Sequence, residues 1–183
     1  MKRWAIGVAV LAMAGCGTSE QVGTQESAPL QEQPAAVPAT TTAAAPAVPP
    51  PDPQPVRDGT CPYLDSDFAA ETNGQHVGRV RLSADEPPAC FFYRSDGGEQ
   101  LRVRVLTGAD PAVAKALVDQ LAPIATSDPA SFPGGWEGGK QPTDNGAVVA
   151  VAKEGTAVVV VTNQQQTIKA VRIAEQAIET LGL

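Results

Sequence analysis

Apolar and polar residues alternate in two stretches of the chain, 77–82 and 101–105, where valine or leucine alternates with arginine. This period of two is typical of a half-buried β-strand. The aromatic run 89–94 lies between the two stretches, and Ser95-Asp96-Gly97-Gly98 after it favours a hairpin turn. We therefore predict three consecutive antiparallel strands in this part of the chain.

Two further strands are predicted near the C-terminus. Residues 147–152 and 157–162 are rich in valine and alanine on both faces, and Lys153-Glu154-Gly155 between them favours a second hairpin. Because apolar residues occupy both faces, these two strands are expected to be central and covered on both sides. Residues 123–146 show no clear period, and we expect them to form a long irregular stretch.

Three helices are predicted from capping residues and from apolar spacing. Asp65 or Ser66 begins a short helix that Asn73-Gly74 ends, and Asp110-Pro111 begins a second one over 112–122. A final helix is expected over about 165–181, with Asn163 as its cap. Its apolar stripe would consist of Ile168, Val171, Ala174, Ile178 and Leu181.

The predicted order of elements is α-βββ-α-loop-ββ-α. Short hairpin connections imply antiparallel pairing. The sequence therefore predicts an α+β domain, with helices packed on an antiparallel sheet of about five strands.

The first sixteen residues have the pattern of a lipoprotein signal. Lys2 and Arg3 precede an apolar run over residues 4–13, and the small pair Ala14-Gly15 stands directly before Cys16. The run is too short for a helix that crosses a bilayer. We expect residues 1–15 to be cleaved and Cys16 to carry a diacylglycerol that anchors the protein in the membrane. The alternative is an ordinary secretory signal in which the cysteine is incidental.

A segment of low complexity separates Cys16 from the predicted domain. Residues 17–56 contain nine prolines, eight alanines, five threonines and no aromatic residue. Such a segment buries too little apolar surface to offset its ordering entropy. We therefore predict three parts: a signal peptide over 1–15, a lipidated and disordered tether over 16–57, and a globular domain over 58–183.

Composition limits the chemistry that is available to the domain. The 183 residues carry 20 acidic and 13 basic side chains, and the pI is about 4.6. This balance argues against a nucleic-acid partner, which requires a surplus of Lys and Arg. His76 is the single histidine and is expected at the surface, and no nucleophile elbow or metalloprotease motif is present. We predict no cofactor and no resident metal.

Cys61 and Cys90 remain once Cys16 is assigned to the lipid. The environment outside the cell membrane is oxidising, so we expect these two cysteines to pair. The closed loop has about 30 residues and is worth about 3–4 kcal/mol in the chain-entropy model. A reactive or metal-binding thiol pair is the alternative.

Two polar segments are candidate binding surfaces. Gly134 to Gly139 places four glycines around Trp136 and Glu137, which suits a pliable recognition loop with an amphipathic tip. Alternatively, Trp136 belongs to the core and the glycines let the backbone turn around it. Gln164, Gln165 and Gln166 at the start of the last helix could bind a glycan or a partner, or could simply form a solvated first turn.

Charged clusters offer weaker candidates. Asp65, Asp67 and Glu71 suggest either a cation site or, more simply, an acidic helix N-terminus. Asp65 or Asp67 could instead pair with Glu137 as catalytic carboxylates. A further set of arginines is either an anion-binding patch or the polar outer face of a sheet, in which each arginine pairs with a carboxylate: Arg79, Arg81, Arg102 and Arg104.

Several blocks in one order resemble the actinobacterial lipoprotein family called domain of unknown function 2020. The resemblance covers roughly residues 60–183. Its main blocks are Cys61-Pro62-Tyr63-Leu64-Asp65, Thr72-Asn73-Gly74-Gln75, Pro88-Ala89-Cys90-Phe91, Gly135-Trp136, Gly138-Gly139 and Thr162-Asn163-Gln164-Gln165-Gln166. The resemblance implies an envelope-anchored protein of an actinobacterium. It implies no activity and no catalytic residue.

The sequence as a whole favours a non-enzymatic protein on the outer face of the cell membrane. Its small domain would bind an unidentified envelope protein, lipid or glycan, and Trp136, Glu137 and Gln164 to Gln166 would form the contact surface. The first alternative is an enzyme that acts on envelope glycans or lipids through paired carboxylates. The second is a purely structural spacer.

Overall fold

The computed structural model describes residues 46–182. The predicted signal peptide, Cys16 and most of the predicted tether lie outside the described residues. None of the helices in the described part is long and apolar enough to cross a membrane.

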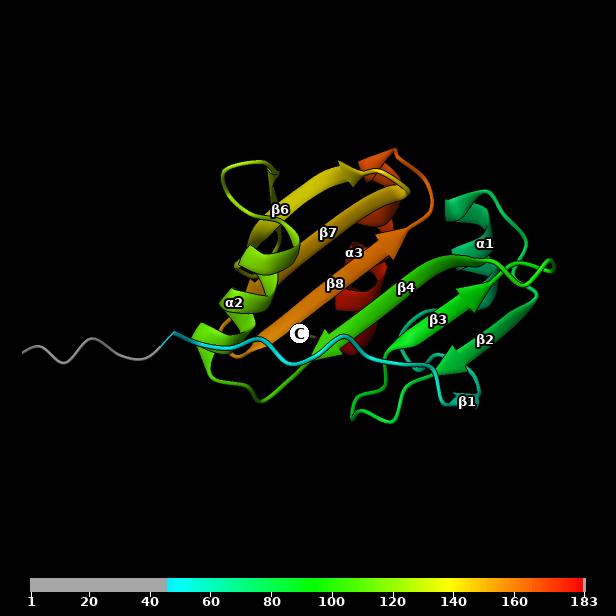
Figure 1. Cartoon of the computed structure of the whole chain (residues 1–183), viewed down its shortest axis with the longest axis horizontal. Coiled ribbons are helices and arrows are strands. Elements are labelled where there is room, and N and C mark those ends of the chain that lie inside the picture. Colours follow the sequence, from blue (N-terminus) through cyan, green and yellow to red (C-terminus); the bar gives the residue numbers. More distant parts are fainter. Residues whose placement is uncertain (1–45, 183) are drawn as a thin grey trace, which may run out of the picture. The chain divides into compact units, whose positions relative to one another are not determined.

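The described residues form one open antiparallel sheet of eight strands with three helices (Figure 1). The strands lie in the order β1-β2-β3-β4-β8-β7-β6-β5, so β4 and β8 join the two halves of the chain. The strands are β1 (Arg57–Asp58), β2 (Arg79–Leu82), β3 (Cys90–Tyr93), β4 (Glu99–Leu106), β5 (Asp128–Phe132), β6 (Trp136–Thr143), β7 (Gly146–Lys153) and β8 (Thr156–Thr162). The helices are α1 (Ser66–Asn73), α2 (Pro111–Leu121) and α3 (Thr167–Leu181).

The helices cover both faces of the sheet. Helices α1 and α3 pack on one face over the larger apolar cluster, which includes Phe92, Val103 and Ile173. Helix α2 packs on the opposite face over a smaller cluster, in which Leu117 meets Val148 and Val159. Strands β7 and β8 contribute to both clusters. As predicted, these two strands are apolar on both faces because helices cover both faces of the sheet there.

The predicted α+β class is confirmed, whereas the predicted number of about five strands is wrong. The additional strands are β1, β5 and β6. Strand β1 has only two residues. Strands β5 and β6 occupy the stretch expected to be irregular, and they contain Pro129, Pro142 and two glycines. These residue types have low β propensity, so pairing with β7 rather than local preference makes this region extended.

Local signals place two of the three helix starts correctly. The Asp65 carboxylate accepts hydrogen bonds from the backbone N–H groups of Asp67 and Phe68, and Asp110 caps α2 in the same way. Gly74 ends α1 with φ at +75°, a value that glycine adopts at little cost.

The expected cap of α3 is wrong. The helix begins after Gln166, which makes no side-chain capping bond, and Asn163 serves other contacts. Ile168 of the expected apolar stripe is 57% exposed. The rest of the stripe faces the core: Ala174 and Ile178 are buried together with Ala170, Ile173 and Ala177, and Val171 and Leu181 pack against the same cluster.

The proline-rich segment before β1 lies against the sheet, on the face that α2 also covers. Arg104 donates hydrogen bonds to the carbonyl oxygens of Pro50 and Pro51, and Arg102 forms an ion pair with Asp52 at 2.8 Å. Pro53 is buried, and the Val56 N–H donates to Leu82. Residues 50–56, here called the strap, therefore contact the domain that the sequence predicts to begin at residue 58.

The four arginines flagged in the sequence share the strap's face, and carboxylates offset three of them. Asp58 lies 3.9 Å from Arg79 and 3.6 Å from Arg81, and Glu99 lies 3.1 Å from Arg102. Burial would lower the pKa of Arg102, but Glu99 and Asp52 outweigh it and the pKa is raised. The arrangement is that of the paired outer face of a sheet rather than of a free basic patch.

The strap contacts predict the shortest stable fragment. Residues 58–183 are expected to be about 2–3 kcal/mol less stable than residues 46–183, because the strap supplies several hydrogen bonds worth about 1 kcal/mol each. Urea unfolding followed by circular dichroism measures the difference. Residues 46–183 should be as stable as the full chain. If residues 58–183 are equally stable as well, the structural role of the strap is contradicted.

Candidate functional site

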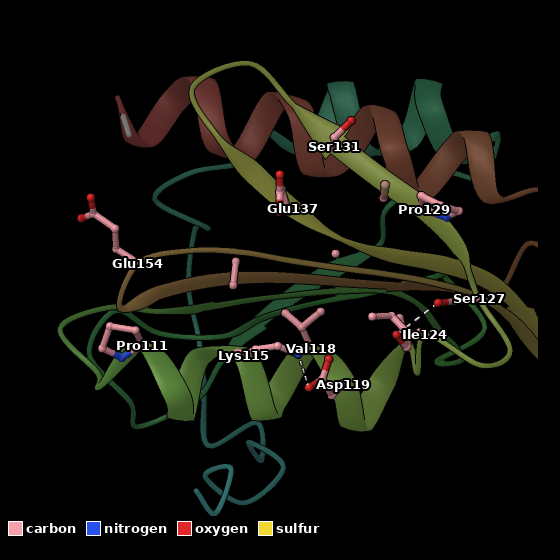
Figure 2. Close-up of a pocket in the computed structure, with 14 residues that line it drawn as sticks. Pro111, Lys115, Val118, Asp119, Ile124, Ser127, Pro129, Ser131, Glu137 and Glu154 are labelled. Atoms are coloured by element: carbon pink, nitrogen blue, oxygen red, sulfur yellow. Dashed lines mark hydrogen bonds and ion pairs between the residues drawn. The ribbon is translucent and has the colours of Figure 1, made fainter. Parts of the chain in front are cut away.

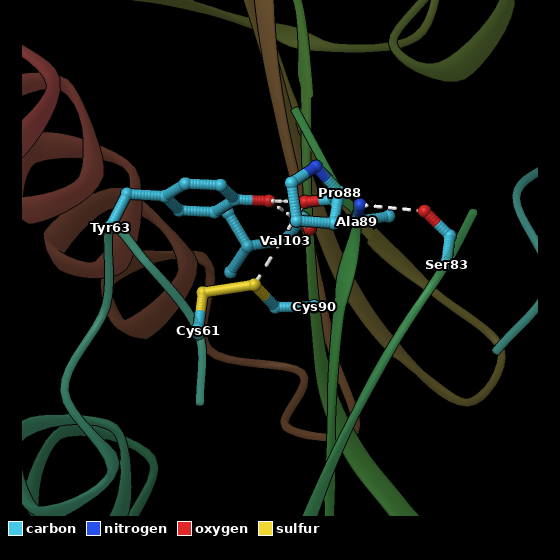
Figure 3. Close-up of a disulfide and its surroundings, with 7 residues drawn as sticks. All are labelled: Cys61, Tyr63, Ser83, Pro88, Ala89, Cys90 and Val103. Atoms are coloured by element: carbon cyan, nitrogen blue, oxygen red, sulfur yellow. Dashed lines mark hydrogen bonds between the residues drawn. A yellow bond between two sulfur atoms is a disulfide. The ribbon is translucent and has the colours of Figure 1, made fainter. Parts of the chain in front are cut away.

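The disulfide and Tyr63 connect two of the sequence blocks that carry the family resemblance. Cys61 and Cys90 are bonded, with their Cα atoms 5.6 Å apart, so the predicted pairing is confirmed. Figure 3 shows the Tyr63 ring beside this bond, with its hydroxyl donating to the carbonyl oxygens of Pro88 and Val103. Burial raises the pKa of the Tyr63 phenol well above its usual value, and Asp85 raises it further. These groups hold the segment before α1 against β3 and β4, which is a structural role.

A buried amide network unites two other blocks. The Asn73 side chain, at the end of α1, donates to Gln100 and Asn163 and accepts from the Thr162 hydroxyl at 2.5 Å. The Lys169 ammonium reaches the Asn73 carbonyl oxygen at 2.8 Å. The network ties α1 to the junction between β8 and α3. Its residues therefore hold the fold together and do not form an open site.

Loss of Asn73 tests this role. The substitution Asn73→Ala is expected to lower the free energy of unfolding by about 1–3 kcal/mol, because it leaves buried polar groups of Gln100 and Thr162 without a partner. Chemical denaturation measures the loss. The exposed Gln165 is the matched control, and Gln165→Ala should change stability by less than about 0.5 kcal/mol. Equal effects of the two substitutions would contradict the network.

The structure corrects the expected contact surface. Trp136 is fully buried, within the cluster under α3, so it is not an exposed loop tip. Gln164 belongs to the amide network, whereas Gln165 and Gln166 are exposed. Thr162 pairs with Ala147 at one end of β7, and Glu137 pairs with Ala152, five residues along it. About 17 Å of strand therefore separates Glu137 from the glutamines, and the predicted residues do not form one surface.

The glycines around Trp136 have separate structural causes. Gly134 and Gly135 adopt φ values of +87° and +89° in the turn between β5 and β6. A Cβ atom at Gly138 would collide with the carbonyl oxygen of Ala150 on β7. A Cβ atom at Gly139 would collide with Ser127 and lie 3.0 Å from the Cβ of Ala122. Gly139 thus lets the segment after α2 press onto β6.

A groove of about 700 Å³ lies between α2 and the outer strands β5 and β6, and we call it the α2–β6 groove. Helix α2 packs mainly on β7 and β8 and leaves much of the outer strands β5 and β6 uncovered on this side. Figure 2 shows α2 along one side of the groove and the β5–β6 hairpin along the other. The lining is mainly apolar and includes Pro111, Val118, Ala122, Ile124, Pro129 and Ala152.

Two glutamates line the groove, one at an end and one near the middle. Figure 2 shows Glu154 toward the end where Pro111 lies, Glu137 near the middle of the groove, and Ile124 toward the opposite end. Lys115 also lines the groove, but its ammonium forms an ion pair with Asp119 at 2.5 Å. Within the described residues, neither Glu137 nor Glu154 has an ion-pair partner within 4 Å. The groove therefore combines an apolar end with an acidic end.

The catalytic pair considered in the sequence does not form. Asp65 and Asp67 belong to the start of α1, on the α3 side of the sheet, whereas Glu137 lines the groove on the α2 side. His76 is exposed, as expected, and its carbonyl oxygen accepts a hydrogen bond from the Gln100 side chain. Among residues 46–182, no group of three His, Cys, Asp or Glu side chains is placed to hold a metal ion.

Comparison with known proteins gives a family and no activity. A sequence model described as "Domain of unknown function (DUF2020)" matches residues 43–183. The chain belongs to this family. The matched range begins before the strap, which agrees with a DUF2020 domain that includes the strap. No curated protein matches the chain.

Sequence reasoning missed most of the groove. The sequence indicates Glu137 both as the neighbour of Trp136 and as a candidate catalytic carboxylate, whereas Glu154 is predicted only as part of a hairpin turn. The available signal was Gly138-Gly139, which marks a close approach of backbone segments inside a strand. The remaining groove residues lie on α2, in the segment 122–127 that follows it, on β5 and at Ala152 of β7, and nothing in their local pattern distinguishes them from ordinary residues of these elements.

Proposed function

We propose that this DUF2020 domain is a binding module whose site is the α2–β6 groove. The observation that carries the proposal is a groove of about 700 Å³ with a mainly apolar lining. Its volume falls within the range of about 300–1,000 Å³ that is common for ligand sites. The exposed Ile124, at 87%, lies at its rim, and covering such a side chain favours binding.

We also propose the setting in which the module works. The lipoprotein signal pattern supports a diacylglycerol on Cys16, and the resemblance supports an actinobacterial cell envelope. The strap reaches the sheet at residue 50, so the tether would extend from Cys16 to about residue 49. At about 3.1 Å per residue, such a tether spans up to about 100 Å. The domain would then bind its ligand on the outer face of the membrane, without catalysis.

Filling the groove tests the proposed site. N-phenyl-1-naphthylamine is a neutral apolar probe whose emission rises in an apolar environment. The substitution Ser131→Phe places a ring at an exposed groove position and should weaken probe binding to the full chain at least fivefold. Thr143→Phe is the matched control, because Thr143 is exposed on β6 but does not line the groove. Equal probe binding by both variants would contradict the proposal.

A further inference from the structure

The α2–β6 groove is elongated. Pro111 lines one end and Ala122 lines the other, and both belong to or directly follow α2. Eleven residues of α-helix rise about 16 Å. An extended peptide rises about 3.3 Å per residue, so the groove has the length of about five extended residues.

The charges of the groove select the ligand. The lining includes Asp119, Glu137 and Glu154 but only one cation, Lys115, which Asp119 already neutralises. The acidic end disfavours fatty acids and anionic lipid headgroups, since like charges repel. It favours a ligand that carries a positive charge at one end and apolar groups along the rest.

The polar groups of the groove favour a peptide over a hydrocarbon chain. The Ser131 side chain lines the groove and makes no hydrogen bond within the described residues. A peptide backbone can form a hydrogen bond with this hydroxyl, whereas an acyl chain cannot. Strand β5 pairs only with β6 in the described part of the chain. Pro129 removes one N–H donor from its free edge, so side-chain contacts in the groove rather than strand addition would fix the peptide.

We propose that the groove binds an extended segment of a partner protein, about five residues long. A lysine or arginine at one end of this segment lies against Glu154, Glu137 adds negative charge nearer the middle of the groove, and apolar side chains lie between Val118 and Ile124. This inference rests on the proposed binding function of the groove. The end of the segment that carries the basic residue therefore lies toward Pro111.

A pentapeptide library tests the inference. Four positions are drawn from Ala, Val, Leu and Pro, and the terminal position carries Lys, Gln or Glu in equal amounts. The immobilised full chain is incubated with the pool at low ionic strength, and bound peptides are counted by mass spectrometry. An exposed ion pair contributes about twofold to fivefold in affinity, so Lys should be enriched over Glu at least about threefold.

Two double variants separate the effect of the groove's charges from non-specific binding of apolar peptides. The double variant Glu137→Gln with Glu154→Gln should return the Lys to Glu ratio to that of the input pool. The matched double variant Glu175→Gln with Glu179→Gln alters exposed carboxylates on α3 and should keep the enrichment. The inference is overturned if the Lys to Glu ratio on the native chain equals that of the input pool, if Glu is enriched, or if enrichment of Lys survives in the Glu137→Gln, Glu154→Gln variant.

The result also distinguishes the inference from the proposed function. If no peptide is retained while N-phenyl-1-naphthylamine still binds and Ser131→Phe weakens its binding, the peptide inference fails and the proposed function stands. Loss of both signals contradicts both.

Discussion

The substitution Trp136→Ala is expected to lower the free energy of unfolding by about 3–5 kcal/mol, the usual range for removing a fully buried tryptophan. Trp136 is fully buried beneath α3, in the same cluster as Val149, Val151 and Ile173. Its removal opens a cavity that β6 cannot close, since Gly138 already lies against the Ala150 carbonyl. Urea unfolding followed by circular dichroism measures the loss without relying on tryptophan emission.

The matched variant is Trp136→Phe. The Trp136 Nε1 has no hydrogen-bond partner within the described residues, so phenylalanine loses volume but no hydrogen bond. We expect it to cost clearly less than alanine. The opposite outcome would be a Trp136→Ala variant with native stability and weakened binding of N-phenyl-1-naphthylamine. That result would show that Trp136 contributes to binding rather than to the core.

Removal of the disulfide is expected to have a comparable effect. Replacing Cys61 and Cys90 together by alanine should lower stability by about 3–4 kcal/mol, because the bond closes a loop with a sequence separation of 29 residues. Cys90 is fully buried and Cys61 is 6% exposed, so the packing of the pair adds to this loss. Guanidinium unfolding of the double variant gives the value.

A reducing agent provides the control for this prediction. Dithiothreitol should destabilise the native chain toward the double variant and leave the double variant itself unchanged. If the native chain unfolds at the same denaturant concentration with and without dithiothreitol, under conditions in which thiol titration confirms reduction, the bond is not a stabilising element.

Features encoded by neighbouring residues could be predicted from the sequence. The caps at Asp65 and Asp110, the turn at Glu154 and the strands with a clear period of two all depend on contacts within a few positions. The pairing of Cys61 with Cys90 followed from the expected compartment and from the lack of other partners. The α+β class followed from the order of these elements.

Features fixed by distant contacts could not be predicted. Strands β5 and β6 are extended because β7 pairs with them, despite their glycines and prolines. The strap looked disordered because its prolines offer little apolar surface, yet Arg102 and Arg104 hold it through contacts some 50 residues away in the chain. Burial of Trp136 depends on α3, which follows it by about 30 residues.

The candidate site shows the same limit. The residues that the sequence grouped around Trp136 and the glutamines serve the scaffold. The groove instead arises where α2 covers β7 and β8 but little of β5 and β6, a feature of the sheet's order. Only Glu137 is common to the predicted surface and the groove.

The central claim is that the α2–β6 groove binds apolar ligands, and chemical-shift mapping tests it most directly. Amide ¹H–¹⁵N spectra of the full chain would be recorded during titration with N-phenyl-1-naphthylamine. We expect saturable shifts in residues 111–131, 137–139 and 152–154, and little change in α1 and α3. Saturable shifts in α1 and α3, or the absence of shifts in the groove, would contradict the claim.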